Sequence, residues 1–327
     1  MKSPLKNADC WPFSIAQSRR YTLEESGVVV PRITVVTPSF NQGEFIERTI
    51  RSILGQGYPN IEYIIMDGGS SDDSVSIIEY YDSEITYWES RKDEGQSDAI
   101  NRGLNMATGE IIAWVNSDDY LLPNALWHVA EVWLTQADPH WISGTCEFYD
   151  DAGNHCYDWE PNPATSLGQA LSQGVGVPQT SSFWSRSLWQ DVGGLNESLH
   201  YCMDEDLWIK FFVKGIRPII VPENLAVRWM QRDSKTASML PFFARDFANL
   251  VKSYKRQVPV EEEGQWKNGT AITSVRWGIQ AWQSIARGNF RGAVVYIFSG
   301  CRLSVPHTVW GVLRGLGAAI KRLKPFQ

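Results

Sequence analysis

Two adjacent carboxylates, Asp118 and Asp119, stand at the end of the apolar stretch "GEIIAWVNSDD". The stretch has the character of a buried strand, so the pair lies at a strand end. Asp is also a favoured turn and helix-capping residue, and Pro123 suits the first turn of a following helix, so local structure alone could explain the pair. The other interpretation is a hard cation at the carboxyl edge of an open sheet, where it could bridge to phosphate oxygens. Residues elsewhere in the chain distinguish these two interpretations.

Three further expected strands end in loops of the same character. The strands are "RITVVTP", "IEYIIMDGG" and "EITYWES", and the loops at their ends span Thr37 to Asn41, Asp67 to Asp73 and Ser90 to Asp98. Each loop taken singly is an ordinary turn between a strand and a helix. Four loops rich in Asp, Ser, Asn and Gly at one sheet edge would be costly unless the charges met a ligand or a metal ion. Together they indicate a binding site.

The elements that position these loops alternate between strand and helix from residue 31 to residue 116. This alternation predicts an α/β fold with a Rossmann-like, mostly parallel open sheet and helices on both faces. Another helix, "NALWHVAEVWLT", precedes a strand-rich section with a turn at Asp150 to Asn154. Helices are then expected at "SRSLWQDVG" and "MDEDLWIKFFVKG", and short strands at "RPIIV" and "AVRWM". From about Ser234 the chain looks helical, with a break expected at Gly264 to Asn268.

Charge is distributed unevenly along the 327 residues. Gly264 to Gln327 holds nine Lys or Arg and no Asp or Glu, whereas Met1 to Glu263 holds 21 basic and 37 acidic residues. A basic tail on an acidic body suggests an anionic surface as partner. No nucleic acid is expected, because the body would repel it and no recognition motif is present. A membrane surface fits better.

The last expected helix, Thr308 to Leu323, has an amphipathic pattern that suits such a surface. A helix that packs on the catalytic domain or on a second subunit is the alternative. The most apolar run of the tail, "GAVVYIFSGC", has ten residues, far below the roughly 20 needed to span a bilayer. The apolar face of the helix consists of Val309, Val312, Leu313, Leu316, Ile320 and Leu323, with Arg314, Lys321 and Arg322 on the other side.

The five cysteines are odd in number and show neither CxxC nor zinc-ligand spacing, which is typical of reduced thiols in a cytosolic protein. The first twenty residues contain no apolar signal region. We therefore expect a cytoplasmic location, at the inner face of the cell membrane if the tail binds a membrane.

Several ordered motifs together make the chain resemble the family 2 glycosyltransferases, which have the GT-A fold. The motifs are "VTPSFNQGEFIERTIRSILGQ", "DGGSSDDS", "DEGQSDAINRGLNMATGEIIAWVNSDD", "QTSSFWSRSLWQDVGGLNES" and "YCMDEDLWIKF". The resemblance implies an N-terminal extension at 1–30, a catalytic domain at 31–235 with a donor half (31–119) and an acceptor half (120–235), and a basic helical C-terminal region at 236–327.

The resemblance also implies the role of individual residues. Thr37, Ser39 and Asn41 would lie by the nucleotide, and Asp67 would hydrogen-bond the base. Asp93, Gln96, Asp98 and Asn101 would line the diphosphate and the sugar. Asp119 would hold a Mn²⁺ or Mg²⁺ ion, and Asp118 would contact the ribose or the metal. Gln231 stands where similar sequences have a His.

The implied reaction moves a sugar from a nucleotide-sugar donor, most simply a UDP-sugar, to a hydroxyl of a glycan or polyprenyl-linked acceptor, as in bacterial surface-polysaccharide assembly. Among the 15 Trp, Trp184 and Trp229 stand beside polar runs and are candidates for stacking on a sugar. The alternatives are a glycoside hydrolase, a nucleotidyltransferase and a non-catalytic sugar-nucleotide-binding module. A hydrolase would need one protonated carboxylic acid, and "TPSFNQGEF" lacks the basic residues that a triphosphate-binding loop would offer.

An inverting transfer also needs a general base for the acceptor hydroxyl. On a helical wheel of "MDEDLWIKFF", Asp204 falls in the middle of an apolar face, where desolvation would raise its pKa. The wheel and the family motif both select Asp204 as the base. Asp206 points elsewhere and is expected to form an exposed ion pair with Lys210.

Overall fold

The computed structural model describes residues 29–137, 140–150, 152–230, 240–286 and 290–322. These residues form two compact units. The first contains the described residues up to Asn162, together with Val177–Glu197 and the segment from Ile216 to Met230. The second contains Pro163–Gly176, Ser198–Gly215 and the described residues from Leu240 onward.

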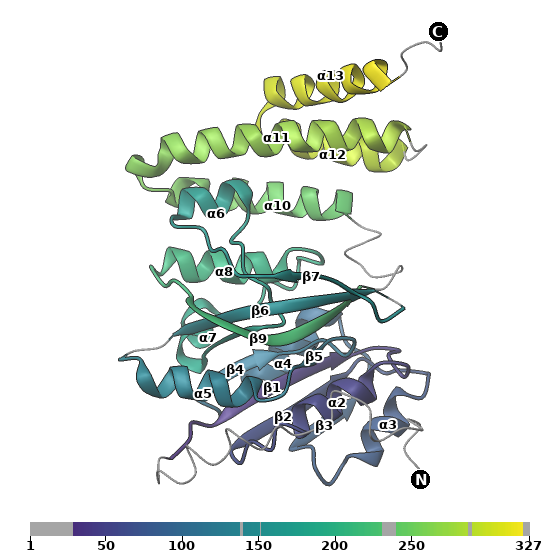
Figure 1. Ribbon diagram of the computed structural model, residues 1–327, viewed down its shortest axis with the longest axis vertical. Coiled ribbons are helices and arrows are strands. Elements are labelled where there is room, and N and C mark those ends of the chain that lie inside the picture. The colour runs from purple at the N-terminus through teal and green to yellow at the C-terminus, as the bar shows by residue number, and fades with distance from the viewer. Residues whose placement is uncertain (1–28, 138–139, 151, 231–239, 287–289, 323–327) are drawn as a thin grey trace. The chain divides into compact units, whose positions relative to one another are not determined.

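The first unit is built on one mixed sheet, whose strand order is β3-β2-β1-β4-β8-β6-β9-β5, with β7 paired to β6 (Figure 1). Strand β1 pairs parallel with β2 and β4, β2 pairs parallel with β3, and β6 pairs parallel with β9. The other pairs, which involve β8, β5 and β7, are antiparallel. The predicted α/β open sheet is therefore confirmed. The strands are β1 Ile33–Ser39, β2 Ile61–Asp67, β3 Tyr87–Ser90, β4 Ile111–Trp114, β5 Tyr120–Leu121, β6 Trp141–Asp150, β7 His155–Trp159, β8 Ser182–Ser185 and β9 Ile219–Met230.

Helices cover both faces of this sheet because its buried strands carry apolar side chains on both sides. On β1, Val35 belongs to the core shared with α2, α3 and α5. Val36 points the other way, where a Cβ on Gly103 of α4 would lie 2.6 Å from its Cγ1. A side chain larger than hydrogen at Gly103 would therefore push α4 off the sheet. The helices are α2 Ile46–Leu54, α3 Ser74–Tyr80, α4 Gln96–Met106, α5 Ala125–Thr135 and α7 Arg186–Val192.

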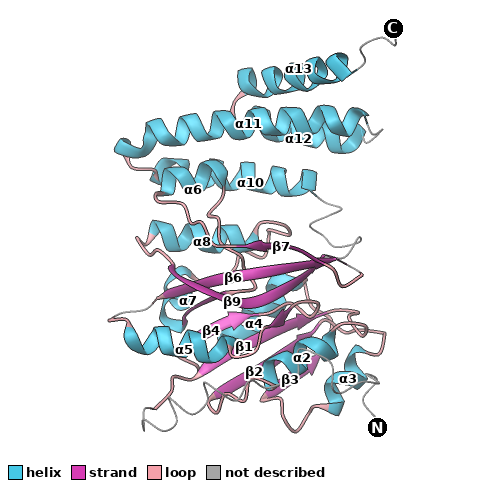
Figure 2. Ribbon diagram, viewed as in Figure 1, coloured by secondary structure: helices cyan, strands magenta, loops and turns pink. Residues whose placement is uncertain are grey.

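The second unit is helical, as Figure 2 shows. Helix α11 packs on α12, α13 and α6, and α10 packs on α12. Glycines allow α11 and α13 to approach closely, since a Cβ on Gly278 would lie 2.3 Å from the Thr308 carbonyl oxygen and one on Gly311 would lie 2.3 Å from the Val275 carbonyl oxygen. The helices are α6 Leu167–Gln173, α8 Met203–Val213, α10 Leu240–Tyr254, α11 Glu263–Ala286, α12 Phe290–Leu303 and α13 Val305–Arg322, with the short 3₁₀ helices η1 Lys255–Gln257 and η2 Val260–Glu262.

Two predictions about local structure are wrong. Helix α11 runs through Gly264 to Asn268 without the expected break. The chain is instead interrupted at Val258 and Pro259, where the backbone is extended, because proline has no N–H to continue a helix. The two short strands expected at "RPIIV" and "AVRWM" are one strand, β9, which pairs with β6 through two register irregularities.

The compact units also differ from the contiguous domains expected from the sequence. Helices α6 and α8 lie inside the expected catalytic range of 31–235, yet they group with the C-terminal helices. The physical reason is side-chain packing: α6 contacts α8, α10 and α11. Of the expected N-terminal extension, residues 1–28 lie outside the part of the chain that the structure describes.

The last helix, α13, packs partly on other helices of the second unit. Neither a membrane nor the catalytic domain, two of the surfaces considered from the sequence, is needed to account for these contacts. Val312 packs against the cluster formed by Ala244, Ala281 and Tyr296. Val309 and Leu313 remain exposed at 51% and 60%, so the predicted apolar face is divided between packing and solvent. Of the helices within the described ranges, none has the length and apolar character required to span a membrane.

Candidate active site

The ends of the parallel strands meet at one edge of the sheet in the first unit. Ser39 is the register partner of Asp67, and Asp67 is in turn the register partner of Ser90. On the other side of β1, Trp114 at the end of β4 pairs with Val36. The prediction that these four strand ends share one edge is confirmed.

Asp67 organises the loop that follows β2. Its side chain is fully buried, and its Oδ2 accepts hydrogen bonds from the backbone N–H groups of Gly69 at 3.0 Å and Ser70 at 2.8 Å. The hydroxyls of Ser70 and Ser90 also donate to this carboxylate, each at 2.6 Å. One carboxylate therefore fixes both its own loop and the end of the neighbouring strand β3.

Asn41 joins the loop after β1 to the loop after β2. Its backbone has a positive φ of 52°, which Asn tolerates better than most residues. Its N–H donates to the Ser70 hydroxyl at 2.7 Å, and its Oδ1 accepts from the Ser71 N–H at 2.9 Å. Asn41 thus shapes the edge where the sequence predicted a nucleotide.

Thr37 and Ser39 lie on β1, and both are buried. The Thr37 hydroxyl accepts a hydrogen bond from the Tyr63 hydroxyl at 3.1 Å. The Ser39 Oγ makes no hydrogen bond within the described part of the chain. Because a buried polar group without a partner costs about 1–3 kcal/mol, Ser39 is well suited to contact a ligand.

The Asp93 carboxylate lies close to Gly68 in the loop after β2, so a side chain at Gly68 would require Asp93 to move. A Cβ on Gly68 would lie 2.8 Å from the Asp93 Oδ2. The other carboxylate oxygen of Asp93 accepts from the Gly95 N–H at 2.9 Å. The absence of a side chain at Gly68 therefore lets the third strand end approach the second.

A chain of side-chain hydrogen bonds runs from α4 to the acidic pair. The Gln96 side-chain amide, at the start of α4, donates to the Asn116 Oδ1 at 2.9 Å. The Asn116 amide then donates to the Asp119 Oδ2 at 3.1 Å. Gln96 is thus connected to the carboxylates that the sequence singled out.

The two adjacent aspartates have different surroundings. Asp119 is only 2% exposed, and its carboxylate also accepts from the Thr180 hydroxyl at 3.1 Å and from the Trp229 N–H at 3.4 Å. Asp118 is half-buried. Asp118 is therefore the carboxylate that a ligand reaches more readily, while Asp119 is embedded in protein donors.

Both carboxylates resist ionisation. Burial, followed by the charge of Asp119, raises the pKa of Asp118 to about 7. Burial also raises the pKa of Asp119 above its ordinary value. The positive charges of Arg228 and Arg48 lower the pKa of Asp118 and so offset part of this rise.

Arg48 is a residue of this site that sequence analysis missed. It lies on α2, and its guanidinium stacks over the rings of Tyr120 and Trp229, with its Cζ 4.9 Å and 4.2 Å from their centroids. Burial lowers the pKa of Arg48, and the charges of Tyr120, Asp119 and Asp118 act in the opposite direction. No local motif could reveal Arg48, because its partners come from distant parts of the chain.

Two of the predicted site residues are tied into the protein. Asp98 pairs with Arg102 one helical turn later, with 3.3 Å between Oδ2 and Nε. The Asn101 amide donates to the Leu195 carbonyl at 3.1 Å and to the Glu197 carboxylate at 2.7 Å. These contacts give both residues a structural role, and a contact with donor stays a prediction for each.

The two candidate tryptophans also differ. Trp184 is fully buried, and its ring centroid lies 5.3 Å from that of Trp114. It is therefore a core residue. Trp229 is half-buried and stacks on Tyr149 as well as on Arg48. Gln231, which follows on the chain, lies outside the described residues.

The predicted base lies in the second unit, at the start of α8. Asp204 is half-buried, and its Oδ1 accepts from the Glu205 N–H at 2.9 Å. The Glu205 carboxylate accepts from the Val175 N–H at 3.0 Å. Burial, followed by the charge of Asp204, raises the pKa of Glu205 to about 8. A half-buried carboxylate beside a second acid is a chemically reasonable proton acceptor.

The helical wheel was wrong about Asp206. This residue is 2% exposed, and it accepts a hydrogen bond from the Tyr254 hydroxyl at 2.9 Å. The predicted pair with Lys210 is present at 2.9 Å, but it is buried on the Asp206 side. The wheel failed because residues on other helices, such as Tyr254 of α10, also cover α8, so the side without apolar residues is buried as well.

The residues present suit a divalent cation, although within the described residues no three His, Cys, Asp or Glu side chains gather as a metal cluster. A cation would stabilise the ionised forms of two adjacent carboxylates whose pKa values are raised. Hard cations prefer carboxylate oxygens as ligands. Asp119, to which the sequence assigned the metal, is 2% exposed and already accepts hydrogen bonds from Asn116, Thr180 and Trp229. Its neighbour Asp118 is therefore the more accessible of the two carboxylates, and metal binding by either stays a prediction.

A family model for glycosyl transferase family 2 matches residues 34–186 of the chain. An uncharacterized glycosyltransferase of Mycobacterium tuberculosis is 38% identical over 182 residues, which is 55% of this chain and 68% of the relative. The range matched by the family model, residues 34–186, includes all four strand ends and the acidic pair.

Two solved structures share the fold. The crystal structure of S. aureus TarS residues 1–349 in complex with UDP-GlcNAc has a TM-score of 0.54 and 16% identity, and the match covers 81% of this chain and 89% of that chain. The mannosyltransferase PcManGT from Pyrobaculum calidifontis, in complex with GDP-Man and Mn²⁺, has a TM-score of 0.55 and 18% identity, with coverage of 96% and 85%.

Proposed function

The chain belongs to glycosyl transferase family 2, and from this premise we propose that it transfers a sugar from a nucleotide-sugar donor to a hydroxyl of a glycan or lipid-linked acceptor. The observation that carries the proposal is the shared strand edge, where Ser39, Asp67 and Ser90 are register partners. A donor with a base, a ribose and a diphosphate needs several such loops at once, and open α/β sheets bind ligands at this edge.

The donor would lie along this edge. Ser39 offers a buried hydroxyl that lacks a partner in the described part of the chain, and Asp93 and Gln96 stand at the next strand end and helix start. The proposed contact of Asp67 with the base would have to replace one of the four hydrogen bonds that its buried carboxylate already accepts from the protein. A UDP-sugar is the proposed donor, supported by the UDP-GlcNAc complex of TarS. The GDP-Man complex of PcManGT makes GDP the first competitor.

The sequence assigned a Mn²⁺ or Mg²⁺ ion to Asp119; because Asp119 is buried and Asp118 is half-buried, the ion would reach Asp118 first, and it would stabilise the negative charge that develops on the leaving diphosphate. The Mn²⁺ of PcManGT supports this choice. Arg48 contributes a second positive charge near the same carboxylates. Departure of a nucleoside diphosphate therefore requires no acid from the protein.

Transfer would proceed by a single displacement with inversion. The acceptor oxygen forms a bond to the anomeric carbon while the bond from that carbon to the diphosphate oxygen breaks, and the bonding electrons leave with the diphosphate. The proton of the acceptor hydroxyl passes to Asp204. The support for Asp204 is its place in the family motif and its half-buried position at the start of α8.

The proposed setting is assembly of a bacterial surface polysaccharide at the inner face of the cell membrane. Exposed apolar residues of the second unit support a membrane contact: Val294 and Phe298 on α12, and Val309, Trp310 and Leu313 on α13. The nine basic residues from Gly264 onward would favour anionic lipids.

A donor panel tests the proposed function. Thermal shifts with UDP, GDP, dTDP and their sugars, with and without Mn²⁺, should identify one stabilising base whose effect needs the metal. The matching nucleotide sugar should then be turned over, with release of the nucleoside diphosphate. Stabilisation without turnover in the presence of acceptor glycans would indicate a binding module, and no stabilisation by any nucleotide would reject the proposal.

A further inference from the structure

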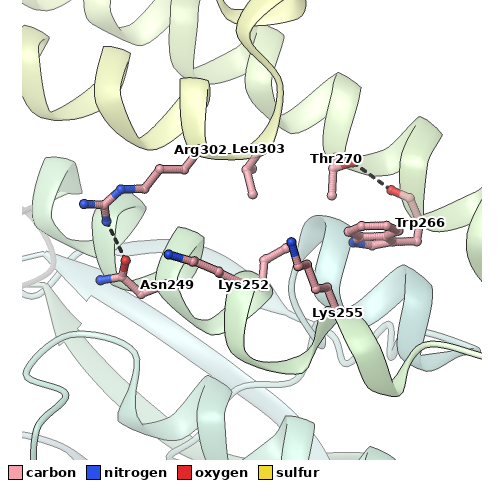
Figure 3. Close-up of a pocket in the computed structure, with 8 residues that line it drawn as sticks. Asn249, Lys252, Lys255, Trp266, Thr270, Arg302 and Leu303 are labelled. Atoms are coloured by element: carbon pink, nitrogen blue, oxygen red, sulfur yellow. Dashed lines mark hydrogen bonds between the residues drawn. The ribbon is translucent and has the colours of Figure 1, made fainter.

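A second candidate site lies inside the helical unit, between α10, α11 and α12. It is a cavity of about 360 Å³. Figure 3 shows the side chains of Arg302 and Leu303 on one side of it, those of Lys252 and Lys255 on the opposite side, and Trp266 at one end. All of the residues that line it belong to the second unit.

The charge of this cavity is of one sign. Lys252, Lys255 and Arg302 line it, and none of its lining residues is acidic. Arg302 donates to the Asn249 side-chain carbonyl, a neutral partner that leaves its charge uncompensated there. All three cations are exposed, so solvent screens most of their mutual repulsion. Three cationic donors nevertheless converge on a lining without an acidic residue, and one bound anion could accept hydrogen bonds from all of them.

Helix geometry does not account for this arrangement. Lys252 lies in the last turn of α10, where a cation interacts favourably with the helix dipole. That explanation does not extend to Lys255, which lies in the following 3₁₀ turn, or to Arg302, which comes from a different helix. The convergence of three cations from separate elements is therefore unexplained by helix stability alone.

The lining also contains apolar surface. Val251, Leu303 and Trp266 line the same cavity. A ligand that fits this lining carries an anionic head with several acceptor oxygens, joined to carbon-rich material that contacts Val251, Leu303 and the indole ring.

We propose that this cavity binds the phosphate group of an anionic amphiphile, such as a phosphorylated lipid. Phosphate oxygens accept charge-assisted hydrogen bonds from Lys and Arg, which are stronger than those between neutral groups. The proposal concerns a site formed by the second unit alone, and it does not depend on the sugar transfer proposed above.

Calorimetric titration of the full chain with dodecyl phosphate, below its micelle concentration, tests the proposal. Binding should be saturable with one site, and dodecyl maltoside, which is neutral, should bind at least about tenfold more weakly. Inorganic pyrophosphate is the second probe. Weaker binding of pyrophosphate than of dodecyl phosphate supports an amphiphile. Equally tight binding would overturn the proposal, because the apolar chain would then contribute nothing and the ligand would be a free phosphate compound.

The variants assign binding to the cavity. The triple variant Lys252→Ala/Lys255→Ala/Arg302→Ala should weaken dodecyl phosphate binding about tenfold or more. The matched control Lys267→Ala/Arg276→Ala/Arg314→Ala removes three exposed positive charges outside the cavity and should bind as wild type does. The three cavity cations are exposed, so circular dichroism should show both variants folded.

Two further results would overturn the proposal. One is wild-type protein that binds dodecyl phosphate no better than dodecyl maltoside. The other is an equal loss of binding in the cavity variant and in the matched control, which would mean that overall charge, and not this cavity, attracts the anion.

Discussion

The guanidinium carbon of Arg48 lies 4.2 Å from the centroid of the Trp229 ring. The two residues come from α2 and β9, which are far apart in the sequence. The stack fixes a positive charge next to Asp118 and Asp119. The proposed donor site would thus have a cation that is ordered by aromatic rings before any ligand is present.

Replacement of Arg48 should weaken donor binding. Arg48→Met keeps the aliphatic stem but removes the charge, so the affinity for UDP with Mn²⁺ should fall about tenfold in calorimetric titration. Arg51→Met, on the same helix and paired with Glu47 at 4.0 Å, is the matched control and should bind UDP as wild type does. Equal affinities for wild type and Arg48→Met would remove Arg48 from the site.

Asp118 and Asp119 should separate function from stability. Asp118→Ala should reduce turnover about 100-fold or more, because it removes a proposed metal ligand. It should not lower the melting temperature, because Asp118 is the more accessible member of a repelling pair of carboxylates. Asp119→Ala leaves the donors of Asn116, Thr180 and Trp229 without their acceptor and should lower the free energy of unfolding by about 2 kcal/mol.

Chelation provides the matching test for the metal. EDTA should abolish UDP binding by wild-type protein, whereas the weak residual binding of Asp118→Ala should not respond to EDTA. If EDTA leaves wild-type binding and turnover unchanged, the metal assignment fails for both aspartates.

Asp204 and Asp206 should also behave differently when each is changed to Asn. Asp204→Asn should reduce transfer about 100-fold or more with UDP affinity unchanged, as expected for loss of a general base. Asp206→Asn should mainly lower the melting temperature, because Lys210 and Tyr254 lose a buried partner. Tyr254→Phe should reproduce part of that loss of stability. A loss of transfer confined to Asp206→Asn would show that Asp204 is not the base.

Glu205 should make the stability of the protein depend on pH. Its pKa rises from an ordinary 4.5 to about 8 in the folded state, so between these values the folded protein holds a proton that the unfolded chain has lost. Protonated Glu205 makes its full contribution to the free energy of unfolding below the pKa that Glu205 has in the unfolded chain. This contribution is lost as the pH rises through the pKa that Glu205 has in the folded protein. Wild type should therefore lose stability towards alkaline pH.

Glu205→Gln cannot ionise and should show a smaller decrease. We compare how far the melting temperature falls between about pH 5 and about pH 9. The fall should be at least about 3 °C smaller for Glu205→Gln than for wild type. Glu261→Gln, at an exposed glutamate, is the control and should follow wild type. Parallel curves for all three proteins would contradict the prediction.

The exposed residues of α13 should determine any membrane contact. Trp310→Ser/Leu313→Ser should reduce recovery of the protein with anionic vesicles in flotation several-fold, because interfacial binding scales with buried apolar area. These side chains are 52% and 60% exposed, so the fold should survive. Truncation is a poorer test, since α11 packs on α6. Equal recovery of variant and wild type would exclude this face.

Much of the first unit could be predicted from the sequence because its signals are local. Strands such as "IEYIIMDGG" are short apolar runs that end in Asp and Gly, and parallel strands must place those ends at one edge. The hydrogen-bond partners of Asp119 could not be predicted in this way. Thr180 and Trp229 reach it from parts of the chain that are distant in the sequence.

The second unit shows the limit of helical periodicity. A wheel compares residues on one helix, so it assigned Asp206 to solvent because that side lacks apolar residues. The Tyr254 hydroxyl and the Lys210 ammonium make the same side a buried polar contact. Likewise, Gly264 suggested a break, but a glycine in the first turn of α11 interrupts few helical hydrogen bonds.

The four hydrogen bonds to Asp67 have a consequence for the thermodynamics of binding. Because the loop after β2 is already tied to the carboxylate, a ligand at this edge would not have to order it, and association would cost little conformational entropy there. The amide protons of Gly69 and Ser70 should accordingly exchange slowly with deuterated solvent in the free protein, at rates that a bound nucleotide changes little.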